Sequence, residues 1–420
     1  MTNKTLPRNA LPSFFKDVEI VGSAHDDFLK YQLDNQANVL KDTKDEIELG
    51  VQNTPRLVTS DRVKSLYVNN DFKAIQNLQK EAQKDIDPIH ENIKLNKEKA
   101  WTRVRGKDGK EFYLSYSKKG SMWVFPEEMR SLTDADGNVT YQCVMQIGSY
   151  TATGNIVGIH SYNFSYKSML PIMALALIVA VALAAILFKA LAFAVTALSL
   201  VLATAASALG FASFSFTIGP VGLFVLAATV IFIIVFIGLM ALWNFINRKY
   251  TIRLQVYNWD KNYDWKIVDD FKSNSVTPST NDPILIDIPK FDPDVIYPPG
   301  FEPVEPIDQI CHYAVIIWEN DNTFLEGCSM ALRFKRGDNP NYGFMWAFSC
   351  PRFKDNQQAA TNQLTTARNY REKEVKWNKN PLGFTIYAGD DQNSNIKFGL
   401  SALNGADDDL YTININICPS

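Results

Sequence analysis

The sequence predicts an α+β multidomain protein with N-terminal helices and a small antiparallel sheet, an all-α apolar segment, and a C-terminal β-sandwich. Three observations predict it. The first hundred residues are charged and helix-prone, residues 169–243 carry one charge, Lys189, and strand-length aromatic runs follow residue 250. The average composition, 46% hydrophobic and 21% charged, hides this segregation. The chain is therefore divided into residues 1–100, 101–165, 166–249 and 250–420.

Residues 1–100 are expected to be mainly helical. In residues 60–86 apolar side chains recur at three- and four-residue spacing, which is typical of a helix with one apolar face. Thr54-Pro55 and Asp87-Pro88 are expected to end helices, because the residue before a proline avoids the helical conformation. The sequence leaves open whether these helices form a small bundle or shield the apolar segment. The other two helices are expected at residues 24–52 and 90–100.

The period of the pattern changes to two near Trp101, which predicts a small antiparallel sheet over residues 101–165. Lys107-Asp108-Gly109 separates two alternating runs and predicts a hairpin turn. Asp136-Gly137-Asn138 predicts another turn. With Asp134 this group resembles part of a calcium loop, but the remaining ligands are missing, so we expect no metal site.

The apolar segment within residues 166–249 indicates insertion into a membrane, since about 20 apolar residues already span a bilayer. Gly219-Pro220 is expected to interrupt it, because proline cannot continue a helix. The segment then forms either a hairpin of two long helices, which we prefer, or three spans. Lys189 is expected to face a bundle interior, a pore or the headgroup layer. The candidate insertion residues are Lys189, Gly219, Pro220 and Trp243.

Residues 250–420 are expected to form a β-sandwich, because short alternating runs recur with turn residues between them. A Pro- and Asp-rich stretch at 291–306 is expected to be a long loop, and the polar segment 356–376 a helix. Strands are predicted near 250–259, 265–271, 283–289, 312–319, 328–335, 343–350, 384–389, 395–402 and 410–417.

The sequence offers no catalytic motif. It contains no G-x-S-x-G, P-loop or H-E-x-x-H pattern, and its four histidines stand far apart. We therefore expect no enzyme and no cofactor. A net charge of −3 without a basic stripe gives no case for nucleic acid.

The cysteines and the N-terminus bear on the compartment. Five cysteines lack metal-type spacing, and the sequence leaves open whether the four in the C-terminal part form disulfides. The first twenty residues contain no apolar core of a Sec signal peptide. We expect synthesis in the cytoplasm, then release or delivery.

Four motifs in the C-terminal part stand in a particular order: YTIRLQVYNWDKNYDWKIV at 250–268, DFKSNS at 270–275, AFSCPR at 347–352 and WNKNP at 377–381. Residues 250–420 resemble the actinoporin-type cytolysins of sea anemones. The motifs are similar to that family's opening strands, its Tyr-Phe-Arg-Ser-Gly segment, its Phe-Ser-Val-Pro-Tyr motif and its Tyr-Asn-x-x-Pro motif. The resemblance implies a two-sheet β-sandwich that binds phosphocholine headgroups.

Carried over position by position, the resemblance implies a lipid-headgroup site. Ser273 matches the serine of the first headgroup-facing loop, and Ser349 and Pro351 match the Phe-Ser-x-Pro motif. Trp377 stands at the last tyrosine of the pocket, and Tyr370 near the first of that group. Aromatic faces attract a quaternary ammonium through cation–π interaction, while hydroxyls and a basic residue hold a phosphate.

The chain departs from the family at three pocket tyrosines, which are Arg352, Gln357 and Lys376 here. Because cations partly replace an aromatic cage, the predicted ligand is either phosphocholine or an anionic headgroup, with a glycan as a further alternative. Arg352 joins the candidate site for this reason. Trp346 and Phe348 can belong to the site or to the sandwich core.

Arg336-Gly337-Asp338 is interpreted as a hairpin loop with its glycine in the left-handed conformation, not as an adhesion motif.

We expect a pore-forming toxin that docks on target-cell membrane lipids through the sandwich, inserts the apolar segment and forms a homo-oligomer in the membrane. The order of apolar segment and sandwich is the main reason. One alternative is an integral membrane protein with an exposed lipid- or glycan-binding sandwich. Another is a membrane-permeabilising effector delivered by a secretion system with a partner or chaperone.

Overall fold

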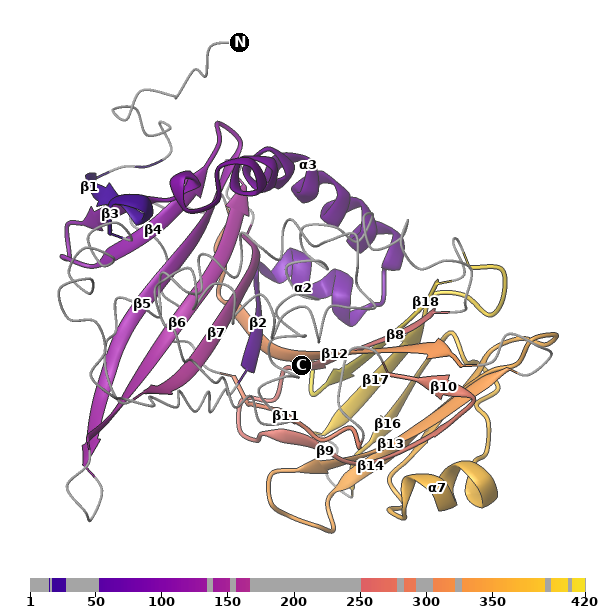
Figure 1. Ribbon diagram of the computed structural model, residues 1–420. Coiled ribbons are helices and arrows are strands. Elements are labelled where there is room, and N and C mark those ends of the chain that lie inside the picture. Colours follow the sequence, from indigo (N-terminus) through magenta and orange to yellow (C-terminus); the bar gives the residue numbers. More distant parts are fainter. Residues whose placement is uncertain are drawn as a thin grey trace.

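The computed structural model describes residues 15, 17–27, 53–133, 139–151, 156–166, 251–277, 283–291, 305–321, 327–389, 394–406 and 410–419. Most of these residues lie in β-strands, which form one 13-stranded and one five-stranded sheet (Figure 1). The larger sheet runs from the N-terminal part of the chain into the C-terminal part. Its strand order is β1-β3-β4-β5-β6-β7-β2-β12-β8-β18-β17-β16, with β10 paired to β12.

The N-terminal part of the large sheet is an antiparallel meander with one added edge strand. The edge strand β1 (Val18–Ser23) pairs with β3, and Gly109 forms the β3–β4 turn with φ +81°. The predicted antiparallel strands and their first hairpin are confirmed, but they belong to the 13-stranded sheet and do not form a separate small sheet. The 136–138 turn lies outside the described residues. The strands are β3 (Thr102–Gly106), β4 (Glu111–Tyr116), β5 (Gly120–Thr133), β6 (Val139–Thr151) and β7 (Ile156–Tyr166).

Two helices precede β3 in the chain: the longer one packs against this meander, and the shorter one packs against the C-terminal strands of the large sheet (Figure 1). Helix α2 (Asp61–Val68) starts at Ser60, whose hydroxyl accepts from the Val63 amide. Helix α3 (Phe72–Asn96) follows and ends in a 3₁₀ turn, η1 (Lys97–Ala100).

Strand β2 (Asn53–Thr59) joins the two parts of the large sheet. One end pairs with β7, and the other pairs with β12 (Gln309–Asn320) over four residues. Arg56 lies opposite His312, and its Nε donates to His312 Nε2 at 3.1 Å. That ring nitrogen accepts, so Nδ1 carries the proton and donates to the Lys290 carbonyl at 2.8 Å. Both side chains are buried, so this contact belongs to the core of the junction.

The C-terminal part is a β-sandwich, as the alternating pattern predicts. The five-stranded sheet, in the order β11-β9-β13-β14-β15, packs against the C-terminal strands of the large sheet, where β18 runs parallel to β8. Trp265, Trp318, Trp346 and Phe334 are fully buried between them. The strands are β8 (Thr251–Asn258), β9 (Trp265–Ser273), β10 (Ser275–Val276), β11 (Ile286–Ile288), β13 (Cys328–Arg336), β14 (Gly343–Cys350), β15 (Gln357–Thr361), β16 (Gly383–Tyr387), β17 (Asn395–Leu400) and β18 (Leu410–Ile417).

The predicted fold class is wrong: the described part of the chain is mainly β, not α+β with an all-α hairpin or three-helix segment. No helix among the described residues is long and apolar enough to cross a membrane. Residues 167–250, with the candidates Lys189, Gly219, Pro220 and Trp243, lie outside the described residues.

Tertiary packing outweighs local signals at three places, and at the first of them, residues 53–59, the sequence predicted only that a preceding helix ends. Residues 53–59 form a strand, since Leu57 and Val58 bury on opposite faces of the sheet; Pro55 lies where β2 has β7 alone as a partner. Helix α3 continues through Pro88, and Ile89 and Ile93 directly after it are fully buried. Most of the helix predicted at 24–52 lies outside the described residues. Strand β15 and a short helical segment replace the helix predicted at 356–376.

We predict that His312→Leu lowers the free energy of unfolding by about 1–3 kcal/mol, because a buried donor of Arg56 loses its acceptor. Urea denaturation measures the loss. Arg62→Gln is the control: Arg62 also links an N-terminal helix to the C-terminal part, through Glu305 at 3.0 Å, but both side chains are well exposed. Its expected loss is below about 1 kcal/mol. Equal losses would contradict a core role for the buried contact.

Candidate functional site

A row of hydroxyls crosses one end of the five-stranded sheet. Ser273 of β9 lies opposite Ser329 of β13, which lies opposite Ser349 of β14. Ser349 in turn lies opposite Gln357 of β15. Residues directly opposite each other in antiparallel strands point to the same face, with Cα atoms about 4.5–5.5 Å apart. The register therefore gathers three serines and a glutamine into one polar row, the serine row.

The serine row lies on the outer face of the sandwich. The neighbouring residues Met330 and Phe348 point into the core and are fully buried, so by alternation the serines point outward. Ser273 is exposed, Ser349 half-buried and Ser329 9% exposed. Among the described residues, none of these hydroxyls has a hydrogen-bond partner within the protein. They are available to a ligand or to water.

The loop of residues 351–356 starts and ends at the serine row, because it joins Ser349 and Cys350 to Gln357. Pro351 is half-buried, while Arg352 is exposed and its guanidinium lies 5.8 Å from the centroid of the Phe353 ring. Phe353 is 77% exposed. The loop thus presents a cation and a large apolar side chain next to the row.

A short helical segment covers the same outer face further along the strands. It consists of α7 (Ala367–Asn369) and η3 (Tyr370–Glu374), and Figure 1 shows α7 beside the five-stranded sheet. The Ala367 amide donates to Asp269 of β9 at 2.7 Å, which ties the segment to the sheet. Tyr370 packs on Ala331 and Ala347 and is 2% exposed. Burial, and then Glu374, raises the pKa of Tyr370, so its hydroxyl stays protonated.

Trp377 stands at the edge of this covered area, beside the serine row. The Asn378 amide donates to the Gln358 carbonyl at 3.1 Å, and Gln358 directly follows Gln357 of the row. Trp377 is half-buried and packs against the buried cluster that contains Tyr370, Ala331 and Ala347. The Arg371 guanidinium lies over its ring, 5.0 Å from the centroid.

The structure brings the predicted headgroup residues to one face, although their exposure to solvent differs. Ser273, Ser349 and Trp377 reach the surface there, and Pro351 and Arg352 follow the row directly. Tyr370 is 2% exposed and packs under this surface on Ala331 and Ala347, so it is not exposed on the face as predicted. The open question about Trp346 and Phe348 is answered, because both are fully buried in the sandwich core.

The Arg336-Gly337-Asp338 triplet lies in the β13–β14 hairpin, with φ +53° at Gly337, which confirms the turn interpretation. The Arg336 guanidinium is held 3.3 Å from the Tyr342 ring centroid and 4.2 Å from that of Tyr263. Such stacking on two rings engages the arginine within the protein.

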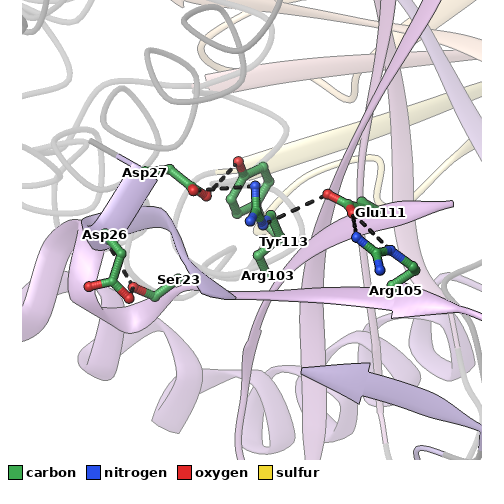
Figure 2. A network of polar contacts seen from close by, with 7 residues as sticks. All are labelled: Ser23, Asp26, Asp27, Arg103, Arg105, Glu111 and Tyr113. Carbon is green, nitrogen blue, oxygen red and sulfur yellow. Dashed lines mark hydrogen bonds and ion pairs between the residues drawn. The ribbon is translucent and has the colours of Figure 1, made fainter. Parts of the chain in front are cut away.

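A second polar cluster lies on the meander. Figure 2 shows Asp27 pointing toward Arg103, 3.2 Å away, and toward Tyr113, whose hydroxyl donates to it at 3.1 Å. Glu111 accepts from Arg105 at 2.9 Å and lies 3.7 Å from Arg103. Burial, and then Asp27, raises the pKa of Tyr113, so the phenol remains a donor. The positive charges of Arg103 and Arg105 are compensated by the negative charges of Asp27 and Glu111. The contacts of Asp27 fasten residues 24–27 to β3 and β4.

The described cysteine thiols are buried, and the described residues form no metal-binding group. Cys311, Cys328, Cys350 and Cys418 are buried, and none of these four forms a disulfide. Burial raises the pKa of Cys418 to about 12, which keeps its thiol unreactive at neutral pH. Within the described ranges, no group of His, Cys, Asp and Glu side chains could hold a metal ion.

Sequence reasoning missed Ser329, Phe353 and Arg371. A signal for Ser329 existed, because Ser329 and Ser349 are equally far along the chain from Asn339 in the predicted hairpin turn. Phe353 had no pattern to distinguish it from a core residue. Arg371 stands six residues before Trp377, a spacing that helix periodicity does not pair.

No family model matches the chain, and no curated protein sequence matches it. Among solved structures, the crystal structure of the lipid binding protein Nakanori matches 48% of this chain and 89% of its own, with 9% identity and a TM-score of 0.29. At this similarity the match identifies neither a family nor a function.

Proposed function

We propose that the protein binds the headgroups of membrane phospholipids through the outer face of its C-terminal sandwich, without catalysing a reaction. The observation that carries the proposal is the serine row: three hydroxyls without a partner in the described structure, aligned next to a half-buried tryptophan that an arginine covers. The resemblance to actinoporin-type cytolysins supports the same assignment.

The chemistry of the site suits a phosphate ester. Serine hydroxyls donate to phosphate oxygens, and a guanidinium adds charge-assisted hydrogen bonds. Neighbouring serines lie about one strand spacing apart, roughly 4.8 Å, which a single phosphate group can bridge. The exposed Phe353 suits the interfacial layer of a bilayer, where aromatic side chains concentrate.

We predict that the double variant Ser273→Ala/Ser349→Ala binds phospholipid vesicles at least about tenfold more weakly than wild type, because two charge-assisted hydrogen bonds are lost. Co-sedimentation with vesicles of mixed phosphatidylcholine and phosphatidylglycerol measures the affinity. Thr385→Ala is the matched control, since it removes an exposed hydroxyl from β16 in the other sheet. No binding by wild type, or full binding by the double variant, would contradict the proposal.

Permeabilisation of the docked membrane is the second function we propose. The observation that supports this second proposal comes from the sequence: residues 169–243 contain only one charge, Lys189. Transfer of so much apolar surface from water into lipid is strongly favourable. Headgroup binding would bring this segment to the bilayer, where copies of the chain assemble.

For this second function, we predict that wild type releases a trapped dye from the vesicles it binds. Ile233→Asp places a charge in the apolar segment, so it should reduce release at least tenfold while co-sedimentation stays unchanged. Binding by wild type without dye release would exclude permeabilisation and leave an integral or peripheral lipid-binding protein. Equal release by Ile233→Asp would exclude insertion of this segment.

A further inference from the structure

The segment that borders the serine row carries an excess of unpaired positive charge. Residues 371–379 read REKEVKWNK, with four cations and two carboxylates. Both carboxylates are engaged: Glu372 pairs with Arg368 at 3.2 Å, and Glu374 accepts a hydrogen bond from Asn369. Within the described part of the chain, none of the four cations has a carboxylate at ion-pair distance. They are Arg371, Lys373, Lys376 and Lys379.

Arg371 differs from the three lysines because it is held in place. It is half-buried, it lies over the Trp377 ring, and its Nε atom is buried without a hydrogen-bond acceptor in the described structure. Burial lowers the pKa of this guanidinium, and the charge of Glu372 offsets only part of that effect, which indicates a charge that has lost water without a full counter-charge. A bound anion would compensate for that loss.

The contact between Arg371 and the Trp377 ring disfavours the binding of a choline group at this ring. A quaternary ammonium binds to an aromatic face, but Arg371 already occupies a face of Trp377. Arg352 and Lys376 stand in place of aromatic side chains expected from the resemblance, and both are exposed cations. A zwitterionic headgroup would thus bring its positive end toward positive charge.

We infer that Arg371, fixed on Trp377, binds the phosphate of the headgroup, and that the site selects anionic phospholipids over zwitterionic ones. The inference rests on the proposed lipid binding and assigns the lipid class. The Asn378–Gln358 hydrogen bond holds the residue after Trp377 against β15, next to Gln357, which lies opposite Ser349. The inference is that the serine row adds hydrogen bonds to the phosphate that Arg371 binds.

Arg368 provides a matched control for Arg371. It belongs to the same helical segment, and its guanidinium lies 4.9 Å from the Phe271 ring centroid, but Glu372 already neutralises it. Arg368→Gln therefore removes a stacked arginine without removing an unpaired charge. If Arg371 served only to pack on Trp377, the two substitutions would affect binding alike.

The test compares wild type, Arg371→Gln, Arg371→Lys and Arg368→Gln on vesicles of pure phosphatidylcholine and on vesicles with phosphatidic acid, at constant ionic strength. We expect wild type to bind the anionic vesicles at least tenfold more tightly. Arg371→Gln should lose that preference, Arg371→Lys should keep part of it, and Arg368→Gln should keep all of it. Thermal melting checks that each variant is folded.

Two results would overturn the inference and leave lipid binding intact: equal affinity of wild type for both vesicles, or an unchanged preference in Arg371→Gln. Absence of binding to every vesicle would instead overturn lipid binding itself. A titration with soluble glycerol phosphate, followed by tryptophan fluorescence, distinguishes a phospholipid headgroup from a free phosphate ester as the ligand. An Arg371-dependent response to it without vesicle binding would mean a free phosphate ester and would overturn the lipid assignment.

Discussion

The antiparallel register of β13 between β9 and β14 is the constraint on which the candidate site depends. It sets Ser329 opposite both Ser273 and Ser349, although these residues come from three separate strands. A shift of one residue would turn every side chain of the strand to the other face. The core opposes such a shift, because Met330, Leu332 and Phe334 would leave the sandwich interior.

The same alternation separates the core side chains of β14 from those on the proposed binding face. On β14, Trp346 and Phe348 fill the core, while Ala347 and Ser349 face outward. Small outward residues let the Tyr370 segment lie flat on the sheet, and this segment positions Trp377 and Arg371 beside the row. The proposed binding face therefore consists of the outer side of the sheet and a helical segment fastened by Asp269.

Most strands after residue 250 were predictable, because short apolar and aromatic runs recur with turn residues between them. Burial alternates along β11 and the first half of β9, whereas β14 and β18 are buried at nearly every residue. Strand β2 was not, since only pairing with β7 and β12 makes a strand of a segment that contains Pro55. Ser273 and Ser349 could be predicted from the sequence, because they lie in short motifs and on strands with a predictable register. Arg371 was not, because its importance comes from a tertiary contact and from the absence of a described counter-ion.

Hydrogen–deuterium exchange with and without anionic vesicles shows which backbone meets the membrane, and so whether the outer face of the sandwich binds lipid. We expect vesicles to slow exchange in residues 349–357 and 370–378, at the serine row and its bordering segment. Exchange in residues 102–116 of the meander should stay unchanged. Protection confined to the meander, or no protection at the row despite binding, would contradict the assignment of the site.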